Sequence, residues 1–233
     1  MPSSIDEGRF SAFDILFDPA RQFARLAARP RFLVPILVLT LGTFALSFAC
    51  YSRLDYGWFA QHLLASNPVV ARAAHGADLH LTKDVLLWPG VLTATSAVPV
   101  QWLLLSLYVL FVASALRRPL AMPQALALTA WAGMPYIVAL LPSAINLGLH
   151  GDGHLPPEQV DPTTFGAMLG TPDSALLRGL AAHVGLASLW AWVLFAIGLR
   201  AMLSLRWRVA VALVAIPTLL ILGGSAVLAA MAG

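Results

Sequence analysis

The chain has 233 residues, of which 59% are hydrophobic and only 11% are charged, a composition that lies outside the usual range of a soluble domain. Its net charge of +3 comes almost entirely from arginine, and no basic soluble segment carries interleaved aromatic residues, so we expect no nucleic-acid partner. The single cysteine, Cys50, excludes an intrachain disulfide and a multi-thiolate metal site.

Residues 1–31 form a polar, arginine-bearing segment before the first apolar run. Asp18 followed by Pro19 is typical of a helix start, and Pro30 predicts where that helix ends. Arginines recur every four residues on one face and apolar side chains occupy another: Arg21, Arg25 and Arg29, against Phe23, Leu26 and Ala27. The pattern predicts a short amphipathic helix in the membrane interface with its arginines facing lipid headgroups. Such a helix either docks a lipid or partner, or only orients the first span.

Five long apolar runs dominate the rest of the chain. They are residues 32–51, 91–115, 125–147, 181–199 and 209–232. None contains Asp, Glu, Lys or Arg, and each is long enough as a helix to reach about 30 Å, the thickness of the hydrocarbon core of a bilayer. We therefore predict an all-α polytopic integral membrane protein, with a bundle of five transmembrane helices formed by residues 32–233.

The second run is preceded by further apolar residues, so that 85–115 would exceed one perpendicular span. At 1.5 Å per residue it would measure about 46 Å. The tripeptide Trp88-Pro89-Gly90 predicts a break there, with the spanning helix starting near Val91.

Basic residues in the links set the expected orientation. Ten of them fall in the segment before the first span and in the links 116–124 and 200–208, whereas four fall in the other links, where seven acids dilute them. We expect the N-terminus in the cytoplasm and the C-terminus outside, in a bacterial inner membrane.

Six residues in the runs are candidates for helix kinks or close helix packing. They are Pro35, Pro99, Pro135, Asn146, Gly198 and Pro217. Proline inside a helix removes a backbone donor and bends the helix, glycine allows close approach, and asparagine can bond to a neighbouring helix. Broken helices also build substrate sites in transporters. The runs carry no Asp, Glu, Lys or Arg, however, and ion-coupled machines usually need a charged group in the membrane interior.

All six histidines fall on the side expected to be outside, near several acids. His150 and His154 have a spacing that would align them on a helix and so on one zinc ion. Gly151 and Gly153 disfavour a helix there, so we expect no metal ligand, no other cofactor and no catalytic residue. A metal-dependent membrane enzyme using these histidines remains an alternative.

Several segments resemble a known family. Residues 124–136 (QALALTAWAGMPY), the stretch around Leu189-Trp190, and 196–200 (AIGLR) resemble segments of bacterial members of the Yip domain family. Phe17-Asp18-Pro19 and Ile216-Pro217 are similar as well, so the resemblance covers roughly 10–222. It implies a five-span membrane protein with a cytoplasmic N-terminus. The Rab-type GTPase binding of eukaryotic members is not carried over, since the motif and long N-terminal region of those relatives are missing, and bacterial members imply no established activity.

The sequence thus predicts a non-enzymatic scaffold or interaction component. Its expected partners are membrane lipids and either a membrane protein or a second copy of the chain. The competing function is a transporter of a small solute or lipid that uses the proline-broken helices.

Overall fold

The computed structural model describes residues 13–66, 68–74, 80–170, 177, 181 and 184–232, and within them it contains helices and one isolated β-bridge, but no strand. The helices of the first half are α1 (Asp14–Phe17), α2 (Pro19–Ala28), α3 (Leu33–Arg53), α4 (Tyr56–Ser66), α5 (Pro68–Ala73) and α6 (Lys83–Ala115). Those of the second half are α7 (Met122–Ala132), α8 (Met134–Leu149), the 3-10 turn η1 (Pro157–Gln159), α9 (Phe165–Leu169), α11 (Leu186–Leu203) and α12 (Trp207–Ala232). The all-α prediction is confirmed.

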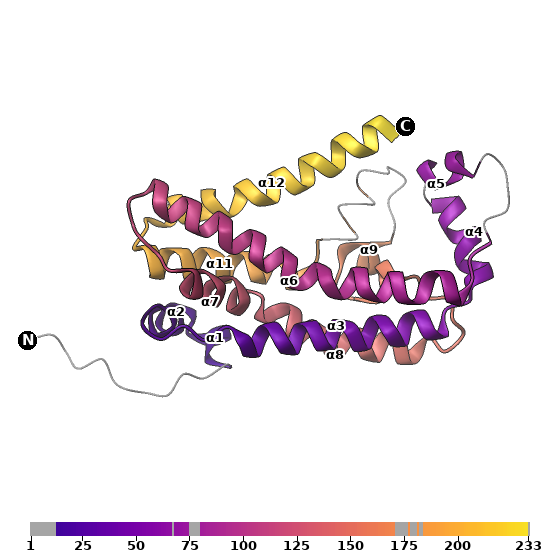
Figure 1. The fold of residues 1–233 in the computed structure, drawn as a ribbon, viewed down its shortest axis with the longest axis horizontal. Helices are drawn as coiled ribbons and strands as arrows, with labels where there is room; N and C mark the ends of the chain where they lie inside the picture. Colours follow the sequence, from indigo (N-terminus) through magenta and orange to yellow (C-terminus); the bar gives the residue numbers. More distant parts are fainter. Residues whose placement is uncertain are drawn as a thin grey trace, which may run out of the picture.

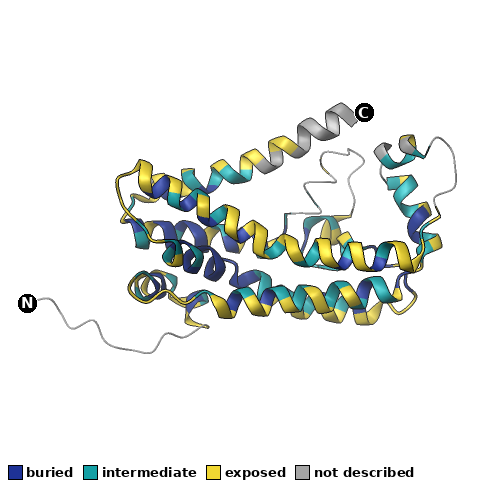
Figure 2. Cartoon of the chain, viewed as in Figure 1, coloured by how far each residue is buried: buried dark blue, intermediate teal, exposed yellow. Residues whose placement is uncertain are grey.

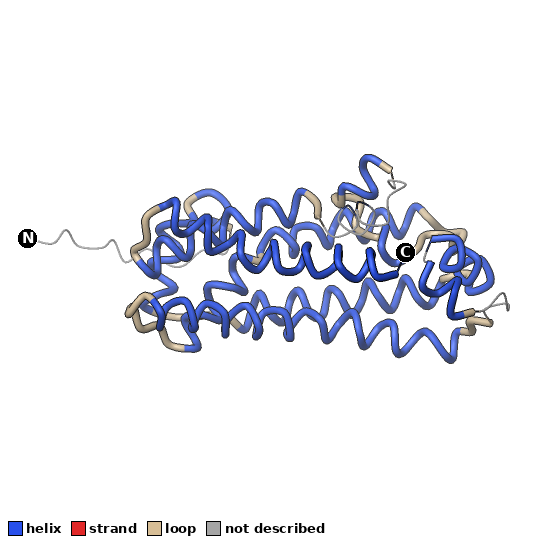
Figure 3. Tube along the Cα trace, turned by 90° about the horizontal axis from the view of Figure 1, so that it is seen from above, coloured by secondary structure: helices blue, strands red, loops and turns tan. Residues whose placement is uncertain are grey.

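The long helices form an elongated bundle (Figure 1). Helix α3 packs against α6 and α8, and α11 packs against α2, α7, α8 and α12. Helix α2 and the links α6–α7 and α11–α12 lie together at one end, which we call the arginine end, and α4 lies at the opposite end, the α4 end (Figures 1 and 3). The three segments expected to share one side of the membrane are therefore neighbours.

Four helices are long and apolar enough to cross a membrane. They are Leu33–Arg53, Lys83–Ala115, the pair α7–α8 taken together as Met122–Leu149, and Leu186–Leu203. The expected fifth span coincides with α12, whose beginning, Trp207–Leu220, is a shorter apolar stretch. A polytopic membrane protein is thus confirmed, whereas the count of five spans stays a prediction.

Helix α6 differs from the expectation of a break at Trp88-Pro89-Gly90. It runs unbroken for 33 residues with Pro89 and Pro99 inside it, which corresponds to about 50 Å. Trp88 and Pro89 are exposed near the α4 end. The helix is longer than the hydrocarbon layer is thick, so this end can project from it and water can satisfy the carbonyl freed by Pro89.

The densest packing lies at the arginine end (Figure 2). Phe23 and Leu26 of α2, Leu128 of α7, and Leu194 and Leu199 of α11 are all at most 1% exposed and belong to one hydrophobic cluster. Figure 2 shows this concentration as dark blue segments in α2, α7 and α11. The described part of the N-terminal segment and the bundle therefore share one core.

Helix α2 begins where the sequence predicts, with Asp18 at its N-cap and Pro19 in its first turn. Its apolar side chains, however, contact protein rather than sinking into lipid as expected for an interfacial helix. Gln22, Phe23 and Leu26 are buried, because α7 and α11 offer apolar surfaces that cover this face. Burial of this kind contributes about 1.5–3 kcal/mol for each large apolar side chain.

The prolines divide into two groups. Pro35 lies in the first turn of α3 and Pro135 at the start of α8, where a missing N–H leaves no helical bond unmade. Pro135 also marks the break between α7 and α8 within the span Met122–Leu149, and Pro35 is buried, so a kink or packing role for these two prolines stays a prediction. Pro99 and Pro217 lie inside α6 and α12, as a kink requires.

Candidate functional site

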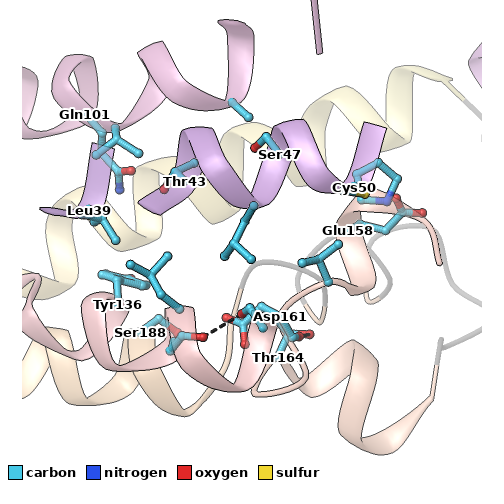
Figure 4. A pocket seen from close by; sticks show the side chains of 18 of the residues that line it. Leu39, Thr43, Ser47, Cys50, Gln101, Tyr136, Glu158, Asp161, Thr164 and Ser188 are labelled. Carbon is cyan, nitrogen blue, oxygen red and sulfur yellow. Dashed lines mark hydrogen bonds between the residues drawn. The ribbon is translucent and has the colours of Figure 1, made fainter. Parts of the chain in front are cut away.

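A cavity of about 600 Å³ lies inside the bundle, between α3, α6, α8, α11 and the loop after α8 (Figure 4). Its apolar lining is Leu39, Leu46, Ala94, Val98, Trp102, Ala139, Leu140, Pro157, Val160, Val184 and Trp192. Its polar, acidic and thiol lining is Thr43, Ser47, Cys50, Tyr51, Gln101, Tyr136, Ser143, Glu158, Asp161, Thr164, Ser188 and Thr218. This volume is in the range of cavities that hold small ligands.

The polar lining groups come from several helices and face one space. In Figure 4, Thr43 and Ser47 of α3 lie across the cavity from Ser188 of α11, while Gln101 of α6 lies toward one end. Ser188 is held by the backbone at the start of its helix, with Oγ 2.8 Å from both N and O of Gly185. Ser143 and Thr218 likewise bond to backbone carbonyls of their own helices. Polar groups from several helices that face one space are typical of ligand sites, which makes this cavity the best-supported binding site in the described structure.

Two carboxylates enter the cavity from the loop after α8. Glu158 belongs to η1 and Asp161 follows it, and Figure 4 shows Glu158 beside Cys50 and Asp161 beside Thr164. In the sequence both acids belong to the link between the third and fourth apolar runs, and the runs themselves contain no Asp or Glu. The loop folds against the bundle, with η1 packed on α3.

Asn146 near the end of α8 holds this loop in place. Its Nδ2 donates to the carbonyls of Gln159 at 2.9 Å and Val160 at 3.1 Å. The expected partner was another helix; the actual partner is the segment that carries the two acids. An asparagine in the last turn of an apolar run was the sequence signal for this contact, since such a side chain needs a partner nearby.

The same loop is tied to the start of α11 by backbone bonds. The N–H of Phe165 donates to Val184 O at 2.9 Å, and the N–H of Leu186 donates to Thr163 O at 3.0 Å. Gly185 sits between them, and a Cβ there would lie 2.3 Å from Thr163 O. Only glycine allows this close approach of two backbones.

The carboxylates have specific polar partners. His62 Nε2 of α4 lies 2.9 Å from Glu158 Oε1. Asp161 Oδ1 accepts from Thr163 at N (2.8 Å) and Oγ1 (2.7 Å). Glu158 is thus connected to the α4 end, whereas Asp161 is held by its own loop.

A second ionic group surrounds Trp58 at the α4 end. His154 lies 3.5 Å from both Asp55 and Asp152, and the Trp58 ring lies 5.2 Å from the rings of His62 and His154. The hydrogen bond from the backbone N–H of Trp58 holds the pKa of Asp55 below its ordinary value, and the side chain of His154 lowers this pKa further. The N–H of His154 does the same for the pKa of Asp152.

The histidines proposed as zinc ligands are not brought together. His150 Nδ1 lies 2.9 Å from Asn146 O, while His154 faces Asp55 and Asp152. In the parts of the chain that the structure describes, no three His, Cys, Asp or Glu side chains are placed to hold a metal ion. His75 and His183 lie outside those parts.

The arginines of α2 lie at the arginine end of the bundle. Arg21 and Arg29 are exposed and Arg25 is partly buried. A further arginine, Arg118, has a role that its sequence position did not indicate: its guanidinium donates to the carbonyls of Leu203 and Ser204 (2.7 Å for the latter). Arg118 therefore caps the last turn of α11, where cations are favoured.

Comparison with known proteins identifies the family. The sequence matches the family model of the Yip1 domain over residues 13–229. The chain belongs to the Yip1 domain family. The resemblance seen in the sequence is confirmed, and the Yip1 domain extends from α1 through almost all of α12. No curated protein and no solved structure gives a significant match.

Proposed function

We propose that this Yip1 domain protein is a non-enzymatic membrane protein that binds a small solute inside its helix bundle. The observation that carries the proposal is the cavity of about 600 Å³ with hydroxyl, amide and carboxylate groups between apolar helices. This gives the transporter alternative more support than the sequence did. Pro99 lies beside the lining residues Val98 and Gln101, as expected of a wall formed by an irregular helix.

The proposed membrane placement gives the cavity a direction. Five spans with a cytoplasmic N-terminus in a bacterial inner membrane would place the arginine end inside and the α4 end outside. Glu158, which contacts α4 through His62, would then lie at the outer mouth of the cavity. Solute would enter from outside, past η1, and reach the hydroxyl groups of α3 and α11.

The sole cysteine provides a direct test. Cys50 lines the cavity and is 4% exposed. In native vesicles the small neutral reagent methyl methanethiosulfonate should modify Cys50, and Ser47→Phe, which fills the cavity, should slow the modification several-fold. Cys50→Ser is the background control, and detergent-unfolded protein gives full labelling. A folded wild-type protein whose Cys50 stays unmodified would contradict an accessible cavity.

Binding alone does not establish transport. Purified protein in liposomes should mediate flux of a solute that slows Cys50 modification, and Asn146→Leu, which releases the acid-bearing loop, should reduce that flux. Solute that protects Cys50 without crossing would assign the protein to binding rather than transport.

A second candidate, the interaction component inferred from the sequence, is favoured by the position of α2. Its apolar face is fixed in the core, so Arg21 and Arg29 are displayed on a rigid support. We propose anionic lipids, a membrane protein or a second copy of the chain as partners. Replacing Arg21, Arg25 and Arg29 by Gln should then lower the number of anionic lipids retained in native mass spectrometry. Unchanged retention and oligomeric state would argue against this candidate.

A further inference from the structure

We infer that the cavity accepts an organic cation, an amine or quaternary ammonium with a small apolar body. The inference rests on the proposed small-molecule binding and adds the chemical class of the ligand. Three properties of the lining support it: its charge, its aromatic side chains and its shortage of metal ligands.

The charge of the lining is one-sided. Glu158 and Asp161 are its carboxylates, and none of the described residues that line the cavity is Lys, Arg or His. His62, the partner of Glu158, is outside the lining. Asp161 has hydrogen-bond donors on Oδ1 from Thr163, and these are neutral groups. The Glu158 side chain is 42% exposed, so it lies at the rim of the cavity, whereas Asp161 is partly buried. Carboxylates that line a cleft with apolar walls attract cations and repel anions.

The aromatic side chains select among cations. Tyr51, Trp102, Tyr136 and Trp192 line the cavity together with many aliphatic groups. Aromatic faces attract ammonium groups, and the aliphatic wall suits the carbon body of an organic ion. Tyr51 is also pressed against α6, since a Cβ on Gly90 would lie 2.4 Å from its ring. The position of this aromatic ring is therefore fixed by packing.

A metal ion fits the lining less well. Ca²⁺ takes six to eight oxygen ligands and Mg²⁺ a near-ideal octahedron. In the described residues no cluster of three or more suitable acidic, histidine or cysteine side chains exists. Two separate carboxylates with aromatic neighbours suit the diffuse single charge of an organic cation better than the compact double charge of a metal ion.

Charged thiol reagents test the ligand class at Cys50. The rate at which each reagent modifies Cys50 is divided by its rate with a small free thiol in solution. This division corrects for differences in intrinsic reactivity between the reagents. On this scale, the trimethylammonium-ethyl methanethiosulfonate should modify wild-type Cys50 about tenfold faster than the sulfonate-ethyl reagent. In Glu158→Gln with Asp161→Asn the ratio should fall toward one, while Asp84→Asn, an exposed acid outside the lining, should keep the wild-type ratio.

The outcomes separate the two proposals. Failure of even the neutral reagent to reach Cys50 contradicts the accessible cavity and, with it, this inference. If the neutral reagent labels wild-type Cys50 normally but the cationic and anionic reagents react at equal corrected rates, the inference is overturned and small-molecule binding is left intact. The same conclusion follows if the cation-to-anion rate ratio is unchanged in the double variant. A neutral rate within about twofold of wild type confirms that the double variant is folded.

A measurement on the unaltered protein gives an independent check. Phenyltrimethylammonium should slow neutral labelling of wild-type Cys50 at concentrations where benzenesulfonate, of similar size and opposite charge, does not. Equal protection by the two ions would overturn a preference for cations.

Discussion

The two ends of the bundle are built by different means. At the arginine end, Phe23, Leu128, Leu194 and Leu199 are fully buried in one continuous apolar cluster. Toward the α4 end the corresponding cluster has Cys50, Leu147 and Leu155 as its buried members, and a cavity lies beside them. Polar contacts of Asn146 and backbone pairing at Gly185 hold that region instead. The two ends thus differ in what holds them: apolar packing at the arginine end, and hydrogen bonds around a cavity toward the α4 end.

The strongest way to break this comparison is Phe23→Ala. Phe23 is 0% exposed and lies against Gly198, where a Cβ would be 3.1 Å from its ring. We expect the free energy of unfolding in mild detergent to fall by about 3–5 kcal/mol. The control is Phe17→Ala, since Phe17 is 86% exposed. Equal effects of the two substitutions would contradict a core built around α2.

Gly185→Ala tests the backbone pairing. The added Cβ would lie 2.3 Å from Thr163 O and 2.7 Å from Thr164 Cα. Overpacking of this kind costs about 1–3 kcal/mol, so thermal stability should fall and neutral labelling of Cys50 should rise as the loop detaches. Gly148→Ala is the matched control, because nothing lies within 4 Å of a Cβ there. Similar behaviour of both variants would show that the pairing does not hold the loop.

Asn146→Leu tests whether the two ends are held independently, and its expected loss of stability is smaller. It removes the donors to Gln159 O and Val160 O, and two lost bonds with their carbonyls left unpaired amount to about 1–3 kcal/mol, felt locally. Cys50 labelling should rise several-fold, and the unfolding of the arginine end should change little. Ser96→Ala, which removes an exposed bond to Thr93 O, should change neither. A global loss of stability would mean that the two ends are one cooperative unit.

The smallest effect is expected from acid. The pKa values of Asp55 and Asp152 are lowered in the folded chain, by the N–H groups of Trp58 and His154. A lowered carboxyl pKa stabilises the fold above the ordinary carboxyl value, and this contribution is lost as the pH falls through the lowered pKa. Hydrogen exchange of α4 amides, corrected for intrinsic rates, should therefore accelerate below about pH 4. Asp55→Asn should remove much of the dependence, and a flat profile in the wild type would exclude this contribution.

The sequence predicted the helices well because a chain segment inside lipid can adopt few backbone structures other than a helix. A run without charges that must satisfy its own backbone groups forms a helix, so α3, α6, α8 and α11 follow from the apolar runs. Asp18 and Pro19 likewise predicted the start of α2 from local chemistry alone. Local rules did not decide the partner of its apolar face, since lipid and protein surfaces are equally apolar.

The cavity could not be predicted in the same way. In the sequence, Glu158 and Asp161 are acids of a link between apolar runs. Their position depends on Asn146, Gly185 and His62, which lie in other segments. The continuity of α6 through Pro89 is another case, because it depends on how far the helix projects beyond lipid. Contacts between distant segments decided both features.

The position of α2 sets an order of events during synthesis. Gln124 Nε2 of α7 bonds to Ala27 O, 97 positions earlier, and Trp131 Nε1 bonds to Arg31 O, 100 positions earlier. At about 5–20 residues per second, α2 leaves the ribosome roughly 5–20 s before this partner exists. During that interval its apolar face has the bilayer surface as its nearest cover, and the arginines beside it favour anionic headgroups. We therefore expect α2 to lie on the membrane surface until α7 and α11 have been made.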